Sequence, residues 1–314
     1  MPLNAISKQN IIKKNSPVGF ISHFNQSYPI DWDKEFGRAA PLVVEIGFGN
    51  GEYLIENARQ NPDKNFIGIE INFDLIKKAA RRMQSSNVAN IRLLKIHATI
   101  ALEYLFPSKS ISQIYSLFPF PWPKKRHHHH RLFNKAFLKL ANNRLIDGGT
   151  FLVVTDDKPY FKWILAQNHA TGLKAQKEII QPKFNTRFER IWKEGGQEDF
   201  FQILFKKITH ARAPLKKETL IAPTIIKKFN PKKYAPKSIT GTKSIIFKKF
   251  IYDEKKKKGS QLVLTAEKNL TQGFLIFFDH SLKGWKIELS TKDRIIKTKL
   301  VQKSFEKIIE ACRR

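Results

Sequence analysis

Several features that define common protein classes are missing from this chain of 314 residues. Its single cysteine, Cys312, excludes an internal disulfide and suits a reducing compartment. No apolar run approaches the length of a membrane span, and the amino terminus lacks the apolar core of a signal peptide. We therefore expect a soluble cytoplasmic protein that does not associate with a membrane.

Acidic residues are also scarce. The chain has 57 Lys and Arg against 27 Asp and Glu, which gives a net charge of +30. Residues 210–314 carry +17 of this charge and residues 1–209 carry +13, so both parts are basic. Such an excess favours a polyanionic partner, nucleic acid before an anionic membrane. A lysine-rich codon bias would explain part of it.

The most informative stretch runs from Leu42 to Gly51. It begins as a short apolar strand, continues as a loop with glycine at every second position (Gly47, Gly49 and Gly51), and leads into an amphipathic helix. Glycine lets such a loop adopt positive φ and lets a ligand approach without meeting a Cβ atom. This order indicates a nucleotide-binding α/β unit; a glycine turn in a non-binding α/β protein is the alternative.

Two acids accompany this loop. Glu45 precedes the first glycine by two residues, where a carboxylate would repel a phosphate but suit a cationic ligand. Glu70 ends a second strand-like run, where it can accept hydrogen bonds from both ribose hydroxyls. The spacing differs from the G-x-G-x-x-G of dinucleotide sites. It fits S-adenosylmethionine better, because the sulfonium and amino groups of that cofactor are positively charged.

Strand-like and helical runs alternate beyond this point, which predicts a doubly wound, Rossmann-like α/β sheet with ligands beyond the carboxyl ends of its strands. The predicted strands are 42–46, 65–71, 91–96, 111–118 and 150–155, with weaker ones at 174–180 and 200–205. The predicted helices after the glycine helix are 74–86, capped by Asp74, then 99–106, 131–143 and 158–169.

The chain divides by composition into three parts. Residues 1–27 are polar and basic and predict a mobile arm, and residues 28–209 form the α/β domain. Prolines between 214 and 236 punctuate a basic linker within the remaining part, 210–314. Four strand-like runs (244–252, 261–266, 274–279 and 285–290) and a helix at 301–313 then predict a small α+β domain.

The loop after the fourth predicted strand combines prolines and aromatic rings. Its residues 118–123, Phe-Pro-Phe-Pro-Trp-Pro, exclude helix and offer rings on which a base can stack. Residues 124–131 follow with basic side chains and four histidines, which suit contacts to RNA phosphates. A zinc site and a solvated surface are the other interpretations of the histidine run.

Two further segments follow later strands. Asp156 lies after the fifth strand and would face the cofactor pocket, although an acid there is often only a helix cap. The segment 185–190, Asn-Thr-Arg-Phe-Glu-Arg, forms a polar connection before the last strand. In it, Glu189 could accept from the N1–H and the amine of guanine. A surface salt bridge with Arg187 or Arg190 is the alternative.

In this order the motifs resemble the bacterial tRNA (guanine-N7-)-methyltransferase family over roughly residues 28–207. The motifs are Glu45-Ile-Gly-Phe-Gly-Asn-Gly51, Gly68-Ile-Glu70, Phe118-Pro-x-Pro-Trp-Pro-Lys-Lys-Arg-His127, Thr155-Asp156 and Thr186-Arg-Phe-Glu189. The resemblance implies a Rossmann-like class I S-adenosylmethionine-dependent methyltransferase. It implies methyl transfer to N7 of guanosine 46 in the tRNA variable loop, with tRNA as partner and no obligate protein partner.

The resemblance also assigns roles to residues. The cofactor would contact Glu45, Gly47, Gly49, Gly51, Glu70, His97 and Phe120. The substrate nucleotide would contact Lys124, Asp156, Thr186, Arg187, Phe188 and Glu189. The RNA backbone would contact Lys125, Arg126, His127, His130 and Arg131. No metal is implied, and residues 210–314 would grip tRNA away from the target base or merely stabilise the protein.

Two positions depart from the family pattern. Phe120 stands where the family usually has an aspartate with the catalytic role, and His97 stands where an acid usually lies beside the adenine. Guanine N7 has a free lone pair, so no base must remove a proton and alignment can account for catalysis. We therefore expect an active enzyme with Asp156 and Glu189 as the catalytic residues. The alternatives are a degenerate RNA-binding protein on this fold and an enzyme acting on rRNA or another base.

Overall fold

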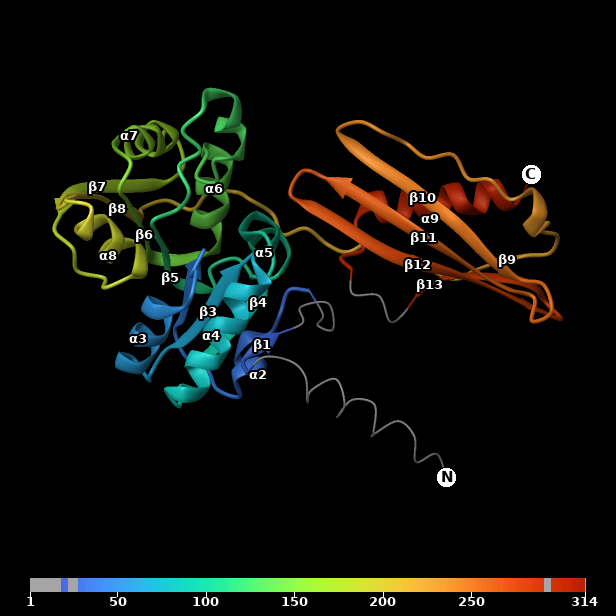
Figure 1. Ribbon diagram of the computed structural model, residues 1–314, viewed down its shortest axis with the longest axis horizontal. Helices are drawn as coiled ribbons and strands as arrows, with labels where there is room; N and C mark the ends of the chain where they lie inside the picture. The colour runs from blue at the N-terminus through green and yellow to red at the C-terminus, as the bar shows by residue number, and fades with distance from the viewer. Residues whose placement is uncertain (1–17, 22–27, 291–294, 314) are drawn as a thin grey trace. The chain divides into compact units, whose positions relative to one another are not determined.

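A computed structural model describes residues 18–21, 28–290 and 295–313, so most of the predicted arm at 1–27 lies outside the described residues. The chain forms two compact units (Figure 1). Of the described residues, unit 1 contains 18–21 and 29–215, and unit 2 contains 28, 216–290 and 295–313. Among the described residues, no helix has the length and apolar character that crossing a membrane requires.

Unit 1 is built on a mixed sheet whose described strands lie in the order β1-β4-β3-β2-β5-β6-β8-β7. The strands are β1 (Phe20–Ile21), β2 (Leu42–Ile46), β3 (Asn65–Glu70), β4 (Ile91–Lys95), β5 (Ile111–Leu117), β6 (Leu145–Thr155), β7 (Leu173–Ile180) and β8 (Phe200–Lys207). All neighbours are parallel except that β8 is antiparallel to both β6 and β7. The strand order reverses between β2 and β5, which places a ligand crevice beyond their carboxyl ends.

Helices flank this sheet, and most of them bury apolar side chains, whereas the buried residue of α8 is Glu189. They are α2 (Trp32–Phe36), α3 (Glu52–Gln60), α4 (Phe73–Ser85), α5 (Ala98–Tyr104), α6 (Lys135–Arg144), α7 (Lys158–Gln167) and α8 (Arg187–Glu194). Leu54 of α3 and Ile76 of α4, for example, are buried in one cluster with Val43 and Phe66 of the sheet. Burying such side chains contributes about 1.5–3 kcal/mol each, which fixes the two helices over the strands that end at the crevice.

The predicted α/β fold is confirmed, with local corrections. The α4 helix is capped by Asn72 and not by Asp74, because the Asn72 side chain accepts from the Asp74 N–H at 2.9 Å. The α6 helix begins at Lys135 instead of residue 131, after Asn134 as its N-cap. The strand β1, in the region expected to be an arm, and the helix α8, in the segment expected to be a polar connection, were not predicted.

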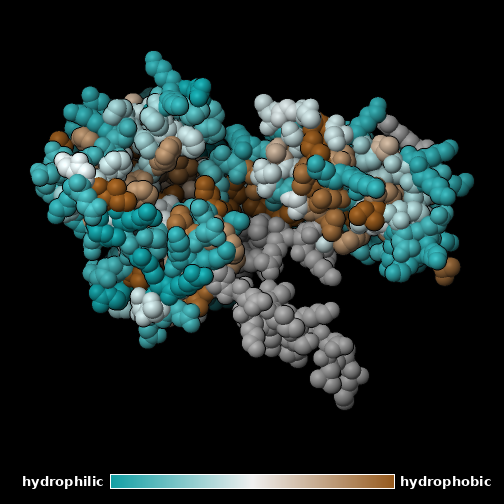
Figure 2. Space-filling model, in the orientation of Figure 1, coloured by the Kyte–Doolittle hydropathy of each residue, from teal (hydrophilic) through white to brown (hydrophobic). Residues whose placement is uncertain are grey.

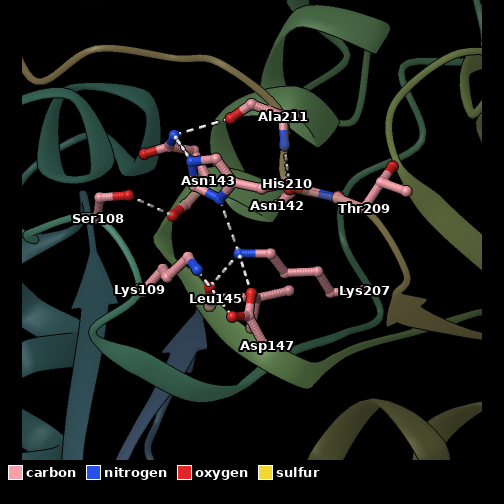
Figure 3. Close-up of polar contacts among 10 residues, drawn as sticks. All are labelled: Ser108, Lys109, Asn142, Asn143, Leu145, Asp147, Lys207, Thr209, His210 and Ala211. Atoms are coloured by element: carbon pink, nitrogen blue, oxygen red, sulfur yellow. Dashed lines mark hydrogen bonds and ion pairs between the residues drawn. The ribbon is translucent and has the colours of Figure 1, made fainter.

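The segment that follows β8 is tied to unit 1 by hydrogen bonds (Figure 3). The Asn142 side chain donates to the Thr209 carbonyl at 2.9 Å and accepts from the Ala211 N–H at 2.8 Å. The buried Lys207 ammonium lies 3.5 Å from the carboxylate of Asp147. Burial lowers the pKa of Lys207, and the nearby Asp147 opposes this shift. The chain therefore remains part of unit 1 for several residues beyond its last strand.

Unit 2 is an antiparallel sheet with a helix on one face, as the predicted α+β domain requires. The described strands lie in the order β10-β11-β12-β13-β9. The elements are β9 (Thr224–Ile226), the short 3-10 helix η3 (Pro231–Lys233), β10 (Lys243–Asp253), β11 (Lys258–Glu267), β12 (Leu270–Ser281), β13 (Gly284–Leu289) and α9 (Lys299–Cys312). Val263 and Phe274 of the sheet share a buried core with Phe305 and Ile308 of α9. Apolar residues also gather over the strands on the face visible in Figure 2.

Candidate active site

The loop between β2 and α3 is left-handed at all three glycines. The angle φ is +73° at Gly47, +57° at Gly49 and +80° at Gly51. A Cβ atom added at Gly47 or Gly49 would meet nothing within 4 Å, so these positions need glycine for backbone conformation and leave open space for a ligand. A Cβ atom at Gly51 would lie 2.8 Å from that of Ala79, so this glycine lets α3 pack on α4.

The two acids beside this loop differ in environment. Glu45 is 4% exposed, and its carboxylate has no hydrogen bond or ion pair among the described residues. Burial raises the pKa of Glu45 to about 8. Glu70 is 9% exposed, but its carboxylate accepts from the N–H groups of Ile71 at 2.7 Å, Asn72 at 2.9 Å and Gly49 at 3.4 Å. Glu70 thus ties the glycine loop to the tip of β3, whereas Glu45 lacks a counter-charge.

A hollow at the carboxyl ends of β2 and β5 joins motifs that are distant in sequence. The first loop contributes Glu45, Gly47 and Gly49, and the start of α8 contributes Thr186, Arg187 and Phe188. Its remaining lining comes from Phe48, Asn50, Glu52, Tyr53, Leu75, Leu117 and Phe118. The structure therefore brings the glycine loop and the Thr-Arg-Phe-Glu motif together. Asp156, Phe120 and Lys124 do not line this hollow.

The loop after β5 has an unusual backbone. Phe118 and Trp122 have φ of +52° and +48°, a left-handed conformation that bulky residues rarely adopt. Between them, Phe120 is 65% exposed, and its ring lies edge-on to Trp122 with 4.9 Å between centroids. Because such strain persists only where surrounding contacts impose it and is concentrated at functional sites, the loop is a candidate for substrate contact.

Arg131 lies beneath this loop and differs from its prediction. We expected it to contact the RNA backbone, but it is only 5% exposed. Its Nε donates to the carbonyl of Pro121 at 2.8 Å, and its guanidinium lies 5.2 Å from the Tyr160 ring and 5.1 Å from the Trp163 ring. The assignment of Arg131 to RNA binding is therefore wrong. It is a positioning residue that fixes the proline-rich loop on α7.

The basic residues before Arg131 remain at the surface. They form the 3-10 helix η2 (Lys125–His130), which follows the exposed Lys124. Lys125, Arg126 and His130 are exposed and His127 is half-buried. The His130 ring lies 4.7 Å from the Trp122 ring. No group of three potential metal ligands occurs in the part of the chain that the structure describes.

Asp156 and Asp157, which follow β6, have different functions. The Asp157 side chain accepts from the N–H of Tyr160 at 2.6 Å and caps α7. Asp156 is not the helix cap, and its carboxyl group is half-buried. Burial raises its pKa, a hydrogen bond between the carboxyl group and its own backbone opposes this shift, and the nearby Asp157 adds to it. The start of α7 therefore accounts for Asp157 but not for Asp156.

The Thr-Arg-Phe-Glu motif begins α8. Thr186 is the N-cap and accepts from the N–H of Glu189 at 3.2 Å. Glu189 is 2% exposed, and one of its oxygens accepts from the N–H groups of Lys183 at 2.6 Å and Phe184 at 3.0 Å. This resembles a capping box, and the Thr-x-x-Glu spacing in the sequence was the signal for a helix that we missed. The carboxylate orders the preceding loop, so its assignment as a catalytic residue is not supported.

The other predicted site residues near the hollow lie at the surface or cap a helix. Arg187 and Phe188 are exposed beside the hollow, Phe188 by 50%. The surface salt bridge within the motif that we considered is absent from the described residues, because Arg190 pairs with Glu52 at 3.0 Å. His97, beyond β4, is the N-cap of α5, with its Nδ1 3.3 Å from the Thr99 N–H, and burial lowers its pKa.

The order of strands, the glycine loop and the acid at the end of β3 define the class of Rossmann-like S-adenosylmethionine-dependent methyltransferases. A family described as "Putative methyltransferase" matches residues 39–202. A tRNA (guanine-N(7)-)-methyltransferase of Chlorobium phaeobacteroides is 49% identical over 172 residues, covering 55% of this chain and 84% of that protein. The chain therefore belongs to the tRNA (guanine-N7-)-methyltransferase family.

Two other relatives bear on the length of the match. The enzyme of the same name from Thermotoga maritima is 38% identical over 182 residues, covering 57% of this chain and 58% of that protein. The one from Aquifex aeolicus is 27% identical over 280 residues, covering 86% of this chain and 93% of that protein. The Aquifex match is too long to be confined to unit 1, so it includes part of unit 2.

Proposed function

We propose that this chain transfers a methyl group from S-adenosylmethionine to N7 of guanosine 46 in the variable loop of tRNA. The observation that supports this most strongly is the hollow in which Glu45 and the glycine loop meet Thr186, Arg187 and Phe188. Family membership supports the same reaction. Methyl transfer needs a cationic donor and a base side by side, and this hollow joins the two motifs.

The residues around the glycine loop fit the cofactor. The open space at Gly47 and Gly49 suits close approach of a ligand, and the buried Glu45 lacks a counter-charge that a cationic ligand would supply. Glu45, Glu70 and the three glycines would hold S-adenosylmethionine, with His97 beside them. When bound, it supplies an electrophilic methyl group on its sulfonium. Glu45 would then ionise, because an adjacent positive charge lowers the pKa of a carboxyl group.

This chain would contribute alignment and electrostatics instead of a general base. Guanine N7 would accept the methyl group through its own lone pair while the bond from methyl to sulfur breaks, so that the sulfur leaves as a neutral thioether and the methylated ring carries the positive charge. We assign Asp156 to balance that charge, since it is half-buried and does not cap α7. Phe120 and Trp122 offer rings for stacking the base, and Arg131 holds them in place through the Pro121 carbonyl. Glu189 would act indirectly, by ordering the loop before α8.

RNA would be bound by two sets of cations. Lys124, Lys125, Arg126, His127 and His130 surround the aromatic loop and would contact phosphates near the target base. Unit 2 carries 25 Lys and Arg against 9 Asp and Glu among residues 216–314 and would grip tRNA further away. The alternative role of unit 2 is to stabilise the protein.

The test is methyl transfer from labelled cofactor to bulk tRNA, with the product mapped by borohydride–aniline cleavage, which cuts at N7-methylguanosine. One cut in the variable loop is the expected result. Asp156→Asn should reduce transfer by roughly 10–100-fold at unchanged tRNA affinity. Asp157→Asn is the matched control, because its amide oxygen can still accept from the Tyr160 N–H and cap α7, so stability and transfer should both stay intact.

Other outcomes of this assay would point to the alternatives. Tight binding of tRNA without cofactor binding or transfer would indicate a degenerate RNA-binding protein, which the departures at Phe120 and His97 would then explain. Label in rRNA but not in tRNA, or in tRNA without aniline-sensitive sites, would replace the proposed substrate or the proposed atom.

A further inference from the structure

A second hollow lies beside the candidate active site, between α4 and α8. Five basic side chains line it: Lys78, Arg81 and Arg82 from α4, and Arg187 and Arg190 from α8. Lys78 lies three and four residues before Arg81 and Arg82, and Arg187 lies three residues before Arg190, so the cations of each helix gather on the side that lines the hollow. The surface over α3 and α4 that faces the viewer in Figure 2 is mostly hydrophilic.

One acid orients part of this basic cluster. Glu52 accepts from Arg82 at 2.9 Å and from Arg190 at 3.0 Å through both of its oxygens. Burial alone would raise the pKa of Glu52, but the hydrogen bonds from Arg82 and Arg190 bring it below its ordinary value. Glu52 therefore stays ionised, and it holds the two guanidinium groups in a fixed orientation at the rim of the hollow.

The cluster has more positive charge than Glu52 can neutralise. Among the described residues, Lys78, Arg81 and Arg187 are exposed and form no ion pair with a carboxylate. Five cations thus face a single anion, and a net charge of +4 remains around the hollow. An anion with several acceptor oxygens would satisfy these donors, because guanidinium groups bind phosphate oxygens through fixed, paired N–H groups.

The position of the hollow identifies the kind of phosphate. Asn50, Glu52, Leu75 and Arg187 line both this hollow and the candidate cofactor hollow. A phosphate bound here would lie next to the place where the methyl group is presented. We infer that the hollow binds a backbone phosphate of the tRNA strand that carries the target guanosine. In naming tRNA, this inference rests on the proposed function.

The experiment measures binding of unmodified tRNA to the full chain over about 50–200 mM salt. The variant Lys78→Ala/Arg81→Ala removes two cations that form no ion pair with any described residue. The matched control is Lys77→Ala on the same helix, because Lys77 does not line the hollow and instead bonds Asp74 at 2.9 Å. The double variant should bind tRNA roughly tenfold more weakly, and the slope of log K against log salt should fall by about 1.5. The affinity for S-adenosylmethionine should not change.

Three results would overturn the inference. A double variant that matches Lys77→Ala in affinity and in salt slope would leave the cluster without a role in RNA binding. Inorganic phosphate that binds the wild type and not the double variant in calorimetry, while their tRNA affinities are equal, would assign the hollow to a free phosphate. If the wild type binds no tRNA, the inference and the proposed function both fail. Wild-type protein that binds tRNA without methylating it would contradict only the proposed function. The inferred phosphate site would remain, because this experiment measures binding alone.

Discussion

Unit 1 and unit 2 both carry a large excess of positive charge, but they arrange it differently. In unit 1, five cations line one hollow, and Glu52 orients two of them. In unit 2, Lys258 and Lys286 form surface pairs with Asp279 and Glu288 at 2.8 and 2.6 Å, and Lys255–Lys257 lie exposed in a turn. Both units are thus strongly basic, but among the described residues the cluster in unit 1 has two guanidinium groups held in place by one acid.

This difference predicts that the two units contribute to different steps, tRNA binding and methyl transfer. Exposed lysines attract RNA through long-range electrostatics, which salt screens and which specifies no orientation. Partly buried groups beside the glycine loop would act at short range on the reacting atoms. Changes in unit 1 near Glu45 should therefore alter methyl transfer at constant tRNA affinity, and changes in unit 2 should do the reverse.

The largest effect is expected from Glu45→Gln. This change keeps the side-chain shape but removes the carboxylate that would face the cationic cofactor, so transfer at subsaturating cofactor should fall by about 100-fold or more, equivalent to about 3 kcal/mol. The melting temperature should not fall, because the buried Glu45 carboxyl has no partner to lose among the described residues. Cofactor affinity by calorimetry and tRNA affinity by filter binding are the measurements. Weaker tRNA binding with normal transfer would contradict the assignment of Glu45 to cofactor binding.

The pH dependence of cofactor binding provides a second test of Glu45. Burial raises the pKa of Glu45 to about 8, so below that pH the unliganded carboxyl group is protonated and must lose its proton to bind a cation. Cofactor affinity should therefore rise about tenfold per pH unit between pH 6 and about 8, and then level off. Calorimetry in buffers of different ionisation enthalpy would measure the released proton. In Glu45→Gln the profile should be flat.

The Glu45 carboxyl group should also make the stability of the unliganded protein decrease with rising pH. Its folded pKa lies above its unfolded value, so the contribution to stability is present at low pH and is lost as the pH rises through about 8. An unfolding midpoint of the unliganded protein that rose over this range, relative to Glu45→Gln, would contradict the assignment.

The sequence predicted those parts of the site that depend on local pattern. The apolar run before Gly47 and the glycine spacing belong to β2, its loop and α3, and the acid at the end of β3 precedes α4. The structure has each of these features where its local pattern predicted it. The helix α8 was equally local, since Thr186 and Glu189 have capping-box spacing, but polar composition led us to expect an irregular connection.

The burial of Arg131 could not be predicted in this way. Its partners are the carbonyl of Pro121, ten residues earlier, and the rings of Tyr160 and Trp163 on α7. A basic residue after a run of histidines has the same local pattern whether it contacts solvent or the interior. Only the packing of α7 against the proline-rich loop decides between RNA contact and a positioning role.

Removing unit 2 should have a smaller effect, on binding alone. A chain that ends at Leu215 retains the hydrogen bonds from Asn142 and Arg144 to residues 209–213. We expect tRNA affinity to fall about tenfold with a shallower salt slope, and the rate at saturating tRNA to stay within about twofold. A chain that ends at Lys207 is the control, because it lacks this segment and should melt at a lower temperature. Unchanged affinity would assign unit 2 a purely stabilising role.

The smallest effect is expected from Phe120→Asp, which restores the residue that the family usually carries. The Phe120 side chain is 65% exposed, and its ring contacts Trp122, while Arg131 holds the loop through backbone carbonyls that the substitution leaves in place. Since guanine N7 attacks through a free lone pair, an added carboxylate has no proton to remove, and the single-turnover rate should change by less than about threefold. A gain of tenfold or more at saturating tRNA and cofactor would mean that a carboxylate at this position stabilises developing positive charge. The reaction would then depend on charge at the proline-rich loop as well as on the alignment provided by the rest of unit 1.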